Sequence, residues 1–190
     1  MKNLMKISQW LCCVLFVTSL VLSCTKENAT LDGSIQGEFL KFETASEKNN
    51  KNNVLYSAWL PSQLPNSSQS SSEFFQLPLI QNKFLNLDED LVMVYGRRNN
   101  IFTLPITMPQ DAESYMVELL PGVKGTTVRL RVTSLDLGPL QDIFFRPSAK
   151  AQFRVVIVPG EKLLSFKSAN SPDFEKMTYA EVAHYFNLNS

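Results

Sequence analysis

The chain has few of the residues from which catalytic and metal sites are usually built. Its 190 residues include one histidine, His184, and three cysteines. A lone histidine supplies neither a zinc cluster nor a nucleophile paired with its base. The chain also lacks a G-x-S-x-G elbow and an H-E-x-x-H helix. The sequence therefore contains no motif for serine or zinc hydrolysis. We expect His184 to be a partly exposed helix residue with no metal nearby.

An excess of charge of one sign is also missing. The 18 basic residues balance the 18 acidic residues, and no long run of either sign occurs. Nucleic acids and anionic lipid surfaces attract proteins through clustered basic charge. Neither is therefore an expected partner, and no motif in the chain predicts a cofactor.

The longest apolar run lies at the start of the chain. Residues 1–9 carry Lys2 and Lys6 and no acid, and residues 10–22 are almost wholly apolar. A helix of residues 10–22 would span roughly 20 Å, which is short of the hydrocarbon core of about 30 Å. A basic start before a short apolar core predicts a secretory signal peptide rather than a membrane-spanning helix.

The apolar run ends in V-L-S-C, residues 21–24, and a polar stretch follows at once. This motif resembles the lipobox of bacterial lipoproteins, in which the cysteine thiol receives a diacylglyceryl group and signal peptidase II cuts before it. The resemblance implies removal of residues 1–23 and lipid attachment at Cys24, which would anchor the chain to a membrane. Thr25 stands where an aspartate would indicate inner-membrane retention, so the outer membrane is favoured. An ordinary secretory cleavage site before a chance cysteine is the alternative.

Residues 24–53 are predicted to be the lipidated cysteine and a flexible tether. They are polar, rich in asparagine and without sustained periodicity, although residues 35–42 could form a short first strand. Cys12 and Cys13 fall in the removed signal. The remaining domain would have no disulfide and would depend on its apolar core.

Residues 54–190 have the pattern of one β-rich domain. Its β-prone segments are 54–60, 74–80, 91–95, 101–107, 114–120, 124–135 and 151–160. The clearest is 124–135, where Val128, Leu130 and Val132 alternate with Arg129 and Arg131. The serine-rich segment 62–72 is predicted to be a mobile loop.

The last part of the domain has a helical pattern. Thr178 and Glu181 have the spacing of a capping box, so we expect a helix over 179–186 that docks Val182 on a sheet. About seven short strands and a terminal helix predict an all-β fold, namely a β-sandwich of antiparallel strands. An open β-barrel is the second choice.

Several segments together resemble a family of small, uncharacterised lipoproteins of Bacteroidota-type bacteria. Besides the lipobox and tether, the matching stretches are V-M-V-Y at 92–95, L-P at 104–105, F-R-V-V-I-V-P at 153–159 and Y-A-E-V-A-H-Y-F at 179–186. The chain departs from the family at Leu91, where a glycine is frequent. The resemblance implies a lipid-anchored β-rich domain and carries no activity that could be transferred.

One candidate metal site is the acidic run Asp88, Glu89 and Asp90, because oxygen-rich loops bind calcium. Consecutive acids cannot all point at one centre, however, so an exposed turn is the simpler expectation. The 18 acids could also supply the two carboxylates of a glycoside hydrolase, but their separation cannot be read from a sequence.

Two further candidates concern binding. Trp59 with Tyr56 could form a platform on which a sugar stacks, although a lone tryptophan in a strand is usually core. Arg97 and Arg98 lie at a predicted hairpin tip, where they could meet an anionic partner or remain solvated.

These observations predict a membrane-anchored, non-catalytic protein of the cell envelope that binds an envelope protein or glycan, or serves as a structural accessory. The alternative is a glycan-binding protein or a carboxylate-dependent hydrolase. That alternative depends on an exposed Trp59 or on a cleft that gathers two acids.

Overall fold

The computed structural model describes residues 41–47, 50–77, 79, 85–123, 125–165 and 172–188. The chain divides into two units, Met1–Gln36 and Gly37–Ser190, and all described residues belong to the second. The predicted signal peptide and Cys24 lie outside the described residues. Among the helices of the described part, none is long and apolar enough to cross a membrane.

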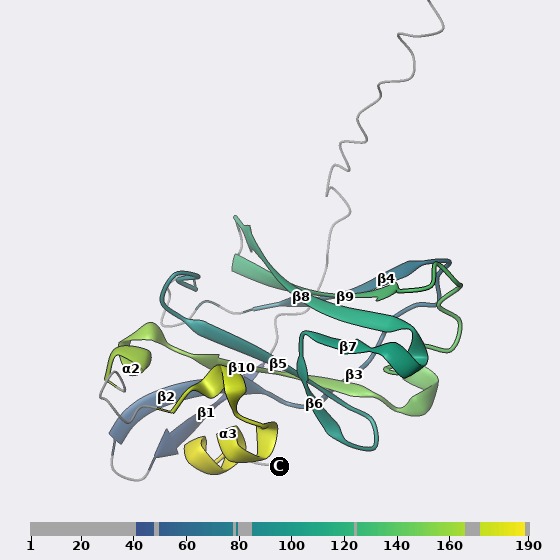
Figure 1. Ribbon diagram of the computed structural model, residues 1–190. Coiled ribbons are helices and arrows are strands. Elements are labelled where there is room, and N and C mark those ends of the chain that lie inside the picture. Colours follow the sequence, from purple (N-terminus) through teal and green to yellow (C-terminus); the bar gives the residue numbers. More distant parts are fainter. Residues whose placement is uncertain are drawn as a thin grey trace, which may run out of the picture. The chain divides into compact units, whose positions relative to one another are not determined.

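Two antiparallel sheets form the domain (Figure 1). The six-stranded sheet has the spatial order β1 (Phe42–Glu47), β2 (Asn50–Ser57), β10 (Gln152–Val158), β5 (Leu91–Arg97) and β6 (Ile101–Leu104), with β3 (Leu60–Pro61) also paired to β10. The four-stranded sheet has the order β4 (Ser70–Gln76), β9 (Gly125–Ser134), β8 (Glu113–Gly122) and β7 (Ile106–Met108). The sheets do not close into a barrel, so the predicted all-β sandwich is confirmed.

The main core lies between the two sheets. Alternation along β9 places Val128, Leu130 and Val132 in this core, as the sequence predicts. Strand β10 is buried on both faces, because its odd-numbered residues from Phe153 to Ile157 face the main core and its even-numbered residues from Arg154 to Val158 face away from it. Strand β5, which contains the predicted strand 91–95, is its neighbour.

A helix covers the other face of the six-stranded sheet. Helix α3 (Tyr179–Phe186) begins with the predicted capping box: Thr178 Oγ1 accepts the Glu181 N–H at 3.4 Å, and the Glu181 carboxylate accepts the Thr178 N–H at 2.7 Å. Val182 and Phe186 are buried in a second core beneath the helix. The other helices are short: η1 (Pro109–Asp111), η2 (Pro147–Ala149), α2 (Gly160–Ser165) and η3 (Phe174–Lys176).

The sheets include residues that the sequence assigns to the tether. Of the possible first strand 35–42, residues 35–40 lie outside the described residues, and Phe42 begins β1. Strand β1 and the start of β2 fall within the predicted tether 24–53, where β1 pairs with β2 from Phe42 opposite Ser57 to Glu47 opposite Asn50. The first residues of β4 fall within the predicted loop 62–72. Both segments are polar and carry no apolar alternation. They form strands because they pair with a neighbouring strand.

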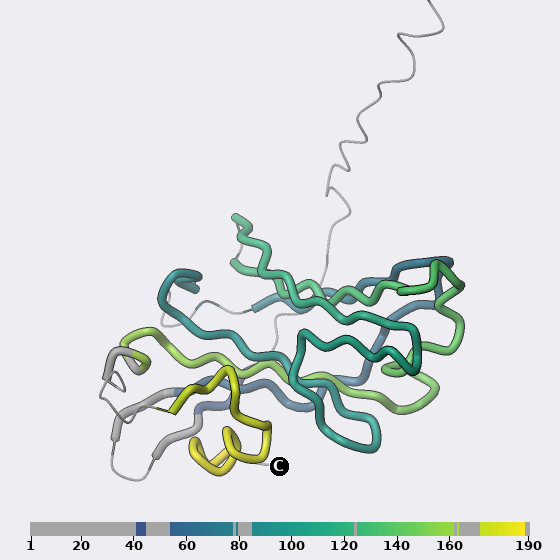
Figure 2. The backbone as a smooth tube through the Cα atoms, viewed as in Figure 1, coloured from purple at the N-terminus to yellow at the C-terminus, as the bar shows by residue number. Residues whose placement is uncertain are grey.

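The predicted strand 101–107 is divided between the two sheets. Strand β6 belongs to the six-stranded sheet and β7 to the four-stranded sheet, and only Pro105 separates them. The Leu104–Pro105 peptide bond is cis. Figure 2 shows the chain passing from one sheet to the other at this point, so one short run supplies an edge to each sheet.

Candidate binding surface

In the acidic turn at 88–90, Asp90 has a structural role. Asp90 accepts the Asn86 N–H at 2.8 Å with Oδ2 and the Gly160 N–H at 2.7 Å with Oδ1. Both oxygens therefore hold the turn and the start of α2, while Asp88 and Glu89 are exposed. In the described part of the chain, no three His, Cys, Asp or Glu side chains gather as a metal site.

The two arginines of the predicted hairpin tip lie apart from each other. Arg97 stacks on Trp59, with 4.2 Å from its guanidinium carbon to the ring centroid, and donates hydrogen bonds to the Gln152 side chain. Arg98 stacks on Phe144 at 4.9 Å and donates to the Phe144 carbonyl at 3.3 Å. Successive residues of an extended chain point to opposite faces, so the pair does not form one basic patch.

Trp59 and Tyr56 lie against the second core beneath α3. Besides Arg97, the buried guanidinium of Arg154 lies 4.8 Å from the Trp59 ring, and Tyr179 meets that ring edge-on at 5.4 Å. Tyr56 is almost fully buried. Arg97 already lies over the Trp59 ring, so a sugar stacking on that face would have to displace it. The other predicted candidate, His184, is exposed on α3.

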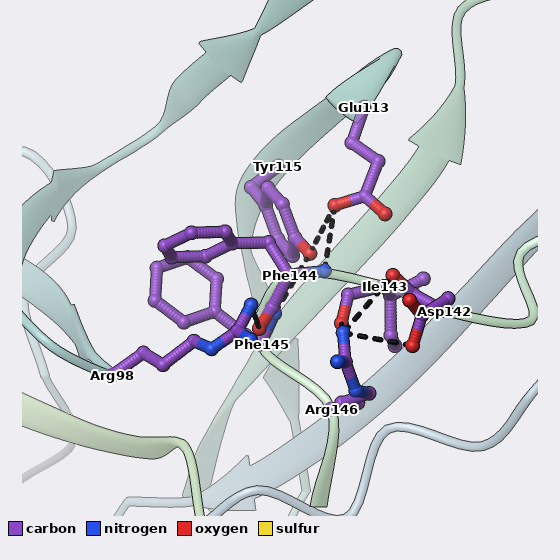
Figure 3. Close-up of polar contacts among 8 residues, drawn as sticks. All are labelled: Arg98, Glu113, Tyr115, Asp142, Ile143, Phe144, Phe145 and Arg146. Atoms are coloured by element: carbon purple, nitrogen blue, oxygen red, sulfur yellow. Dashed lines mark hydrogen bonds and ion pairs between the residues drawn. The ribbon is translucent and has the colours of Figure 1, made fainter. Parts of the chain in front are cut away.

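A buried polar network joins β8 to the loop before β10 (Figure 3). Glu113 Oε2 accepts the Tyr115 hydroxyl at 2.7 Å and the Phe144 N–H at 3.0 Å. The Tyr115 hydroxyl in turn accepts the Phe145 N–H at 3.2 Å. Burial raises the pKa of the Glu113 carboxyl, and the two hydrogen bonds that it accepts oppose that rise.

Arg146 completes this arrangement on the loop itself. Its Nη1 lies 2.9 Å from Asp142 Oδ1 and donates to the Ile143 carbonyl at 3.1 Å (Figure 3). These contacts hold the loop so that Ile143 and Phe145 enter the main core. The network therefore positions a loop.

A second buried carboxyl lies on β4. Glu73 accepts the Gln63 N–H at 3.0 Å, and burial raises its pKa to about 7. Glu73 and Glu113 have different hydrogen-bond partners, so no described contact joins them as a catalytic pair. Both were missed at the sequence level. Their burial could have been predicted from alternation, because each acid occupies a position of its strand that faces the core. In β4, for example, Glu73 lies on the same face as Ser71 and Phe75.

A hollow lies beside the turn between β8 and β9. It has a volume of about 640 Å³ and is open to solvent. Its lining is mostly apolar: Leu85, Leu87, Pro121, Gly122, Val123 and Thr126. None of these described side chains can transfer a proton near neutral pH, and together they offer apolar contact area.

The outward face of the four-stranded sheet combines charge with exposed apolar groups. On it, one cross-strand row contains Phe74, Arg129 and Glu118, and the next contains Ser72, Arg131 and Met116. We call these six residues the arginine face. Phe74 and Met116 are 36% and 43% exposed. The labelled strands of the six-stranded sheet and α3 all lie on the other side of this sheet (Figure 1).

Two guanidinium groups share one carboxylate on the arginine face. Glu118 Oε2 is paired with Arg129 Nη2, whereas Glu118 Oε1 lies 3.8 Å from Arg131 Nε, beyond hydrogen-bond distance. The side chain of Arg131 is 43% exposed. The face therefore carries one surplus positive charge beside apolar side chains, a combination typical of protein interfaces.

Comparisons with known proteins add no further assignment, because no protein-family model, curated protein or solved structure matches the chain.

Proposed function

We propose that the protein is a lipid-anchored protein of the bacterial cell envelope whose domain is a non-catalytic binding module. The arginine face carries this proposal, because an outward sheet face with Arg, Phe and Met side chains has the composition of an interface. The buried carboxylates of Glu73 and Glu113 accept hydrogen bonds from the protein's own backbone. Their contacts support a structural role and give a hydrolase no evident pair of acids.

The proposed anchor is a diacylglyceryl group on Cys24, with the outer membrane as its location. Its support is the order of features at the start of the chain: Lys2 and Lys6, a short apolar core, V-L-S-C and then a polar stretch. Acyl chains at Cys24 would replace the removed apolar segment as the membrane attachment.

Metabolic labelling with an alkyne analogue of palmitate tests the anchor in the full-length chain. The unmodified protein should carry the label and sediment with membranes, and Cys24→Ala should lose the label. Cys13→Ala is the matched control, because Cys13 lies in the segment that is removed, and it should be labelled normally. An unlabelled parent chain, or a Cys24→Ala chain that keeps its label, would refute the anchor.

A further inference from the structure

We infer that the arginine face docks a protein partner that presents a carboxylate to Arg131. This inference rests on the proposed function as a binding module and names the chemistry of its partner. An arginine guanidinium pairs with a carboxylate through two parallel hydrogen bonds, which fixes the orientation of the partner as well as its charge. The occupant is thus a second protein with an acidic residue at the centre of its contact area.

The charge balance of the arginine face indicates that Arg131, rather than Arg129, would bind the carboxylate of the partner. Arg129 already has Glu118 as its ion-pair partner, and its side chain is 29% exposed. Arg131 reaches the same carboxylate only at 3.8 Å and is more exposed. Among the described residues, no other acid forms an ion pair with Arg131. The Arg131 Nε is buried, so a carboxylate supplied from outside would pair with the exposed part of this side chain.

The neighbours of Arg131 favour a protein over other anions. Met116 lies directly opposite Arg131 on β8, and Phe74 lies opposite Arg129 on β4. Aromatic, Met and Arg side chains are enriched at protein interfaces, and Arg is common among the residues that dominate binding energy. Nucleic acids and anionic membranes are bound through several basic groups, whereas this face has a surplus of one.

Site-specific photo-crosslinking in cells of the native host tests the inference. Met116 is replaced by p-benzoylphenylalanine in the full-length protein, with exposed Glu175 of η3 as the control position beside the second core. We expect irradiation to give a covalent adduct with another protein from position 116 and none from position 175. Arg131→Glu should reduce this adduct about tenfold, as expected for loss of a central arginine contact.

Three further variants make the result specific. Lys176→Glu applies the same charge reversal at an exposed site on η3 and should leave the adduct unchanged. Glu118→Gln removes the competing carboxylate and should increase the adduct, opposite to the effect of Arg131→Glu, so misfolding cannot explain both results. In the identified partner, changing the acid at the crosslinked site to lysine should restore the adduct with Arg131→Glu.

The inference is overturned by any of four results: no adduct from position 116, an adduct only with a second copy of this chain, an adduct only with glycan or lipid, or an adduct that Arg131→Glu leaves unchanged. Palmitate labelling of the same cells separates the two proposals. A labelled protein without the adduct refutes the docking surface alone, whereas an unlabelled protein refutes the anchor.

Discussion

Tyr115 donates its hydroxyl to the carboxylate of Glu113, two residues earlier on the same strand, at 2.7 Å. The two side chains point to the same face of β8 because side chains alternate along a strand. Together they accept the backbone N–H groups of Phe144 and Phe145. A loop far along the chain is thus held to β8 by four polar groups that are all satisfied.

Removal of the Tyr115 hydroxyl should destabilise the domain. Tyr115→Phe leaves the buried Phe145 N–H without an acceptor, at an expected cost of about 2 kcal/mol in the free energy of unfolding. Urea denaturation measures this cost. Tyr95→Phe is the control, because the Tyr95 hydroxyl donates only to the weak acceptor Met93 Sδ, and it should cost less than about 1 kcal/mol. Equal costs would argue against the network.

Stability should fall as the pH rises from about 5 to about 7, because burial raises the pKa of Glu73 to about 7. The folded state then binds a proton that the unfolded state releases near pH 4.5, and the cost reaches its full value above the folded pKa. Glu113 acts in the same direction. Glu73→Gln should therefore stabilise the domain at pH 8 by at most about 3 kcal/mol and have little effect at pH 4.

Urea denaturation of both proteins across this pH range gives the measurement for Glu73. The exposed Glu175→Gln serves as the matched control for replacing a glutamate by a glutamine. A Glu73→Gln protein whose stability keeps the full slope between pH 5 and pH 7 would contradict the assignment.

The capping box of α3 should contribute to the stability of the whole domain, because this helix covers the second core. Thr178→Ala removes the side-chain acceptor for the Glu181 N–H and should cost about 1 kcal/mol. His184→Ala, at an exposed position of the same helix, should change stability by no more than about 0.5 kcal/mol. Thermal denaturation followed by circular dichroism compares them, and similar midpoints for the two variants would be the contrary result.

Gly96 should not tolerate a side chain. A Cβ at this position would lie 2.6 Å from Phe145 Cζ, so Gly96→Ala should destabilise the domain by about 1–3 kcal/mol. Phe145→Leu removes the ring atoms that cause the clash. In a double-mutant cycle the two changes should together cost less than their sum. Strictly additive costs would show that the ring does not limit this position.

Elements with strong local signals could be predicted from the sequence. The alternation in 124–135 and the Thr178–Glu181 spacing correspond to β9 (Gly125–Ser134) and α3 (Tyr179–Phe186). Strand β1 and the serines of β4 could not be predicted, since their conformation depends on partners distant in sequence. Ser70, for example, is a strand residue because it lies opposite Thr133.

Only part of the arginine face could be predicted from the sequence. The outward direction of Arg129 and Arg131 follows from alternation in one strand. Their position beside Phe74 and Met116 depends on the register with β4 and β8, which a single sequence does not reveal. In the same way, Arg97 and Arg98 are adjacent in sequence, yet each stacks on a different aromatic ring.

Strand β10 is the last strand of the described residues and lies inside the six-stranded sheet, between β2 and β5. The hairpins β1–β2 and β5–β6 can each pair locally, but they have no common neighbour until residues 152–158 are available. Completion of this sheet must therefore wait for the final part of the chain. A protein truncated before residue 152 would lose the described strand that joins the two hairpins into one sheet, and β3 would lose the strand with which it pairs.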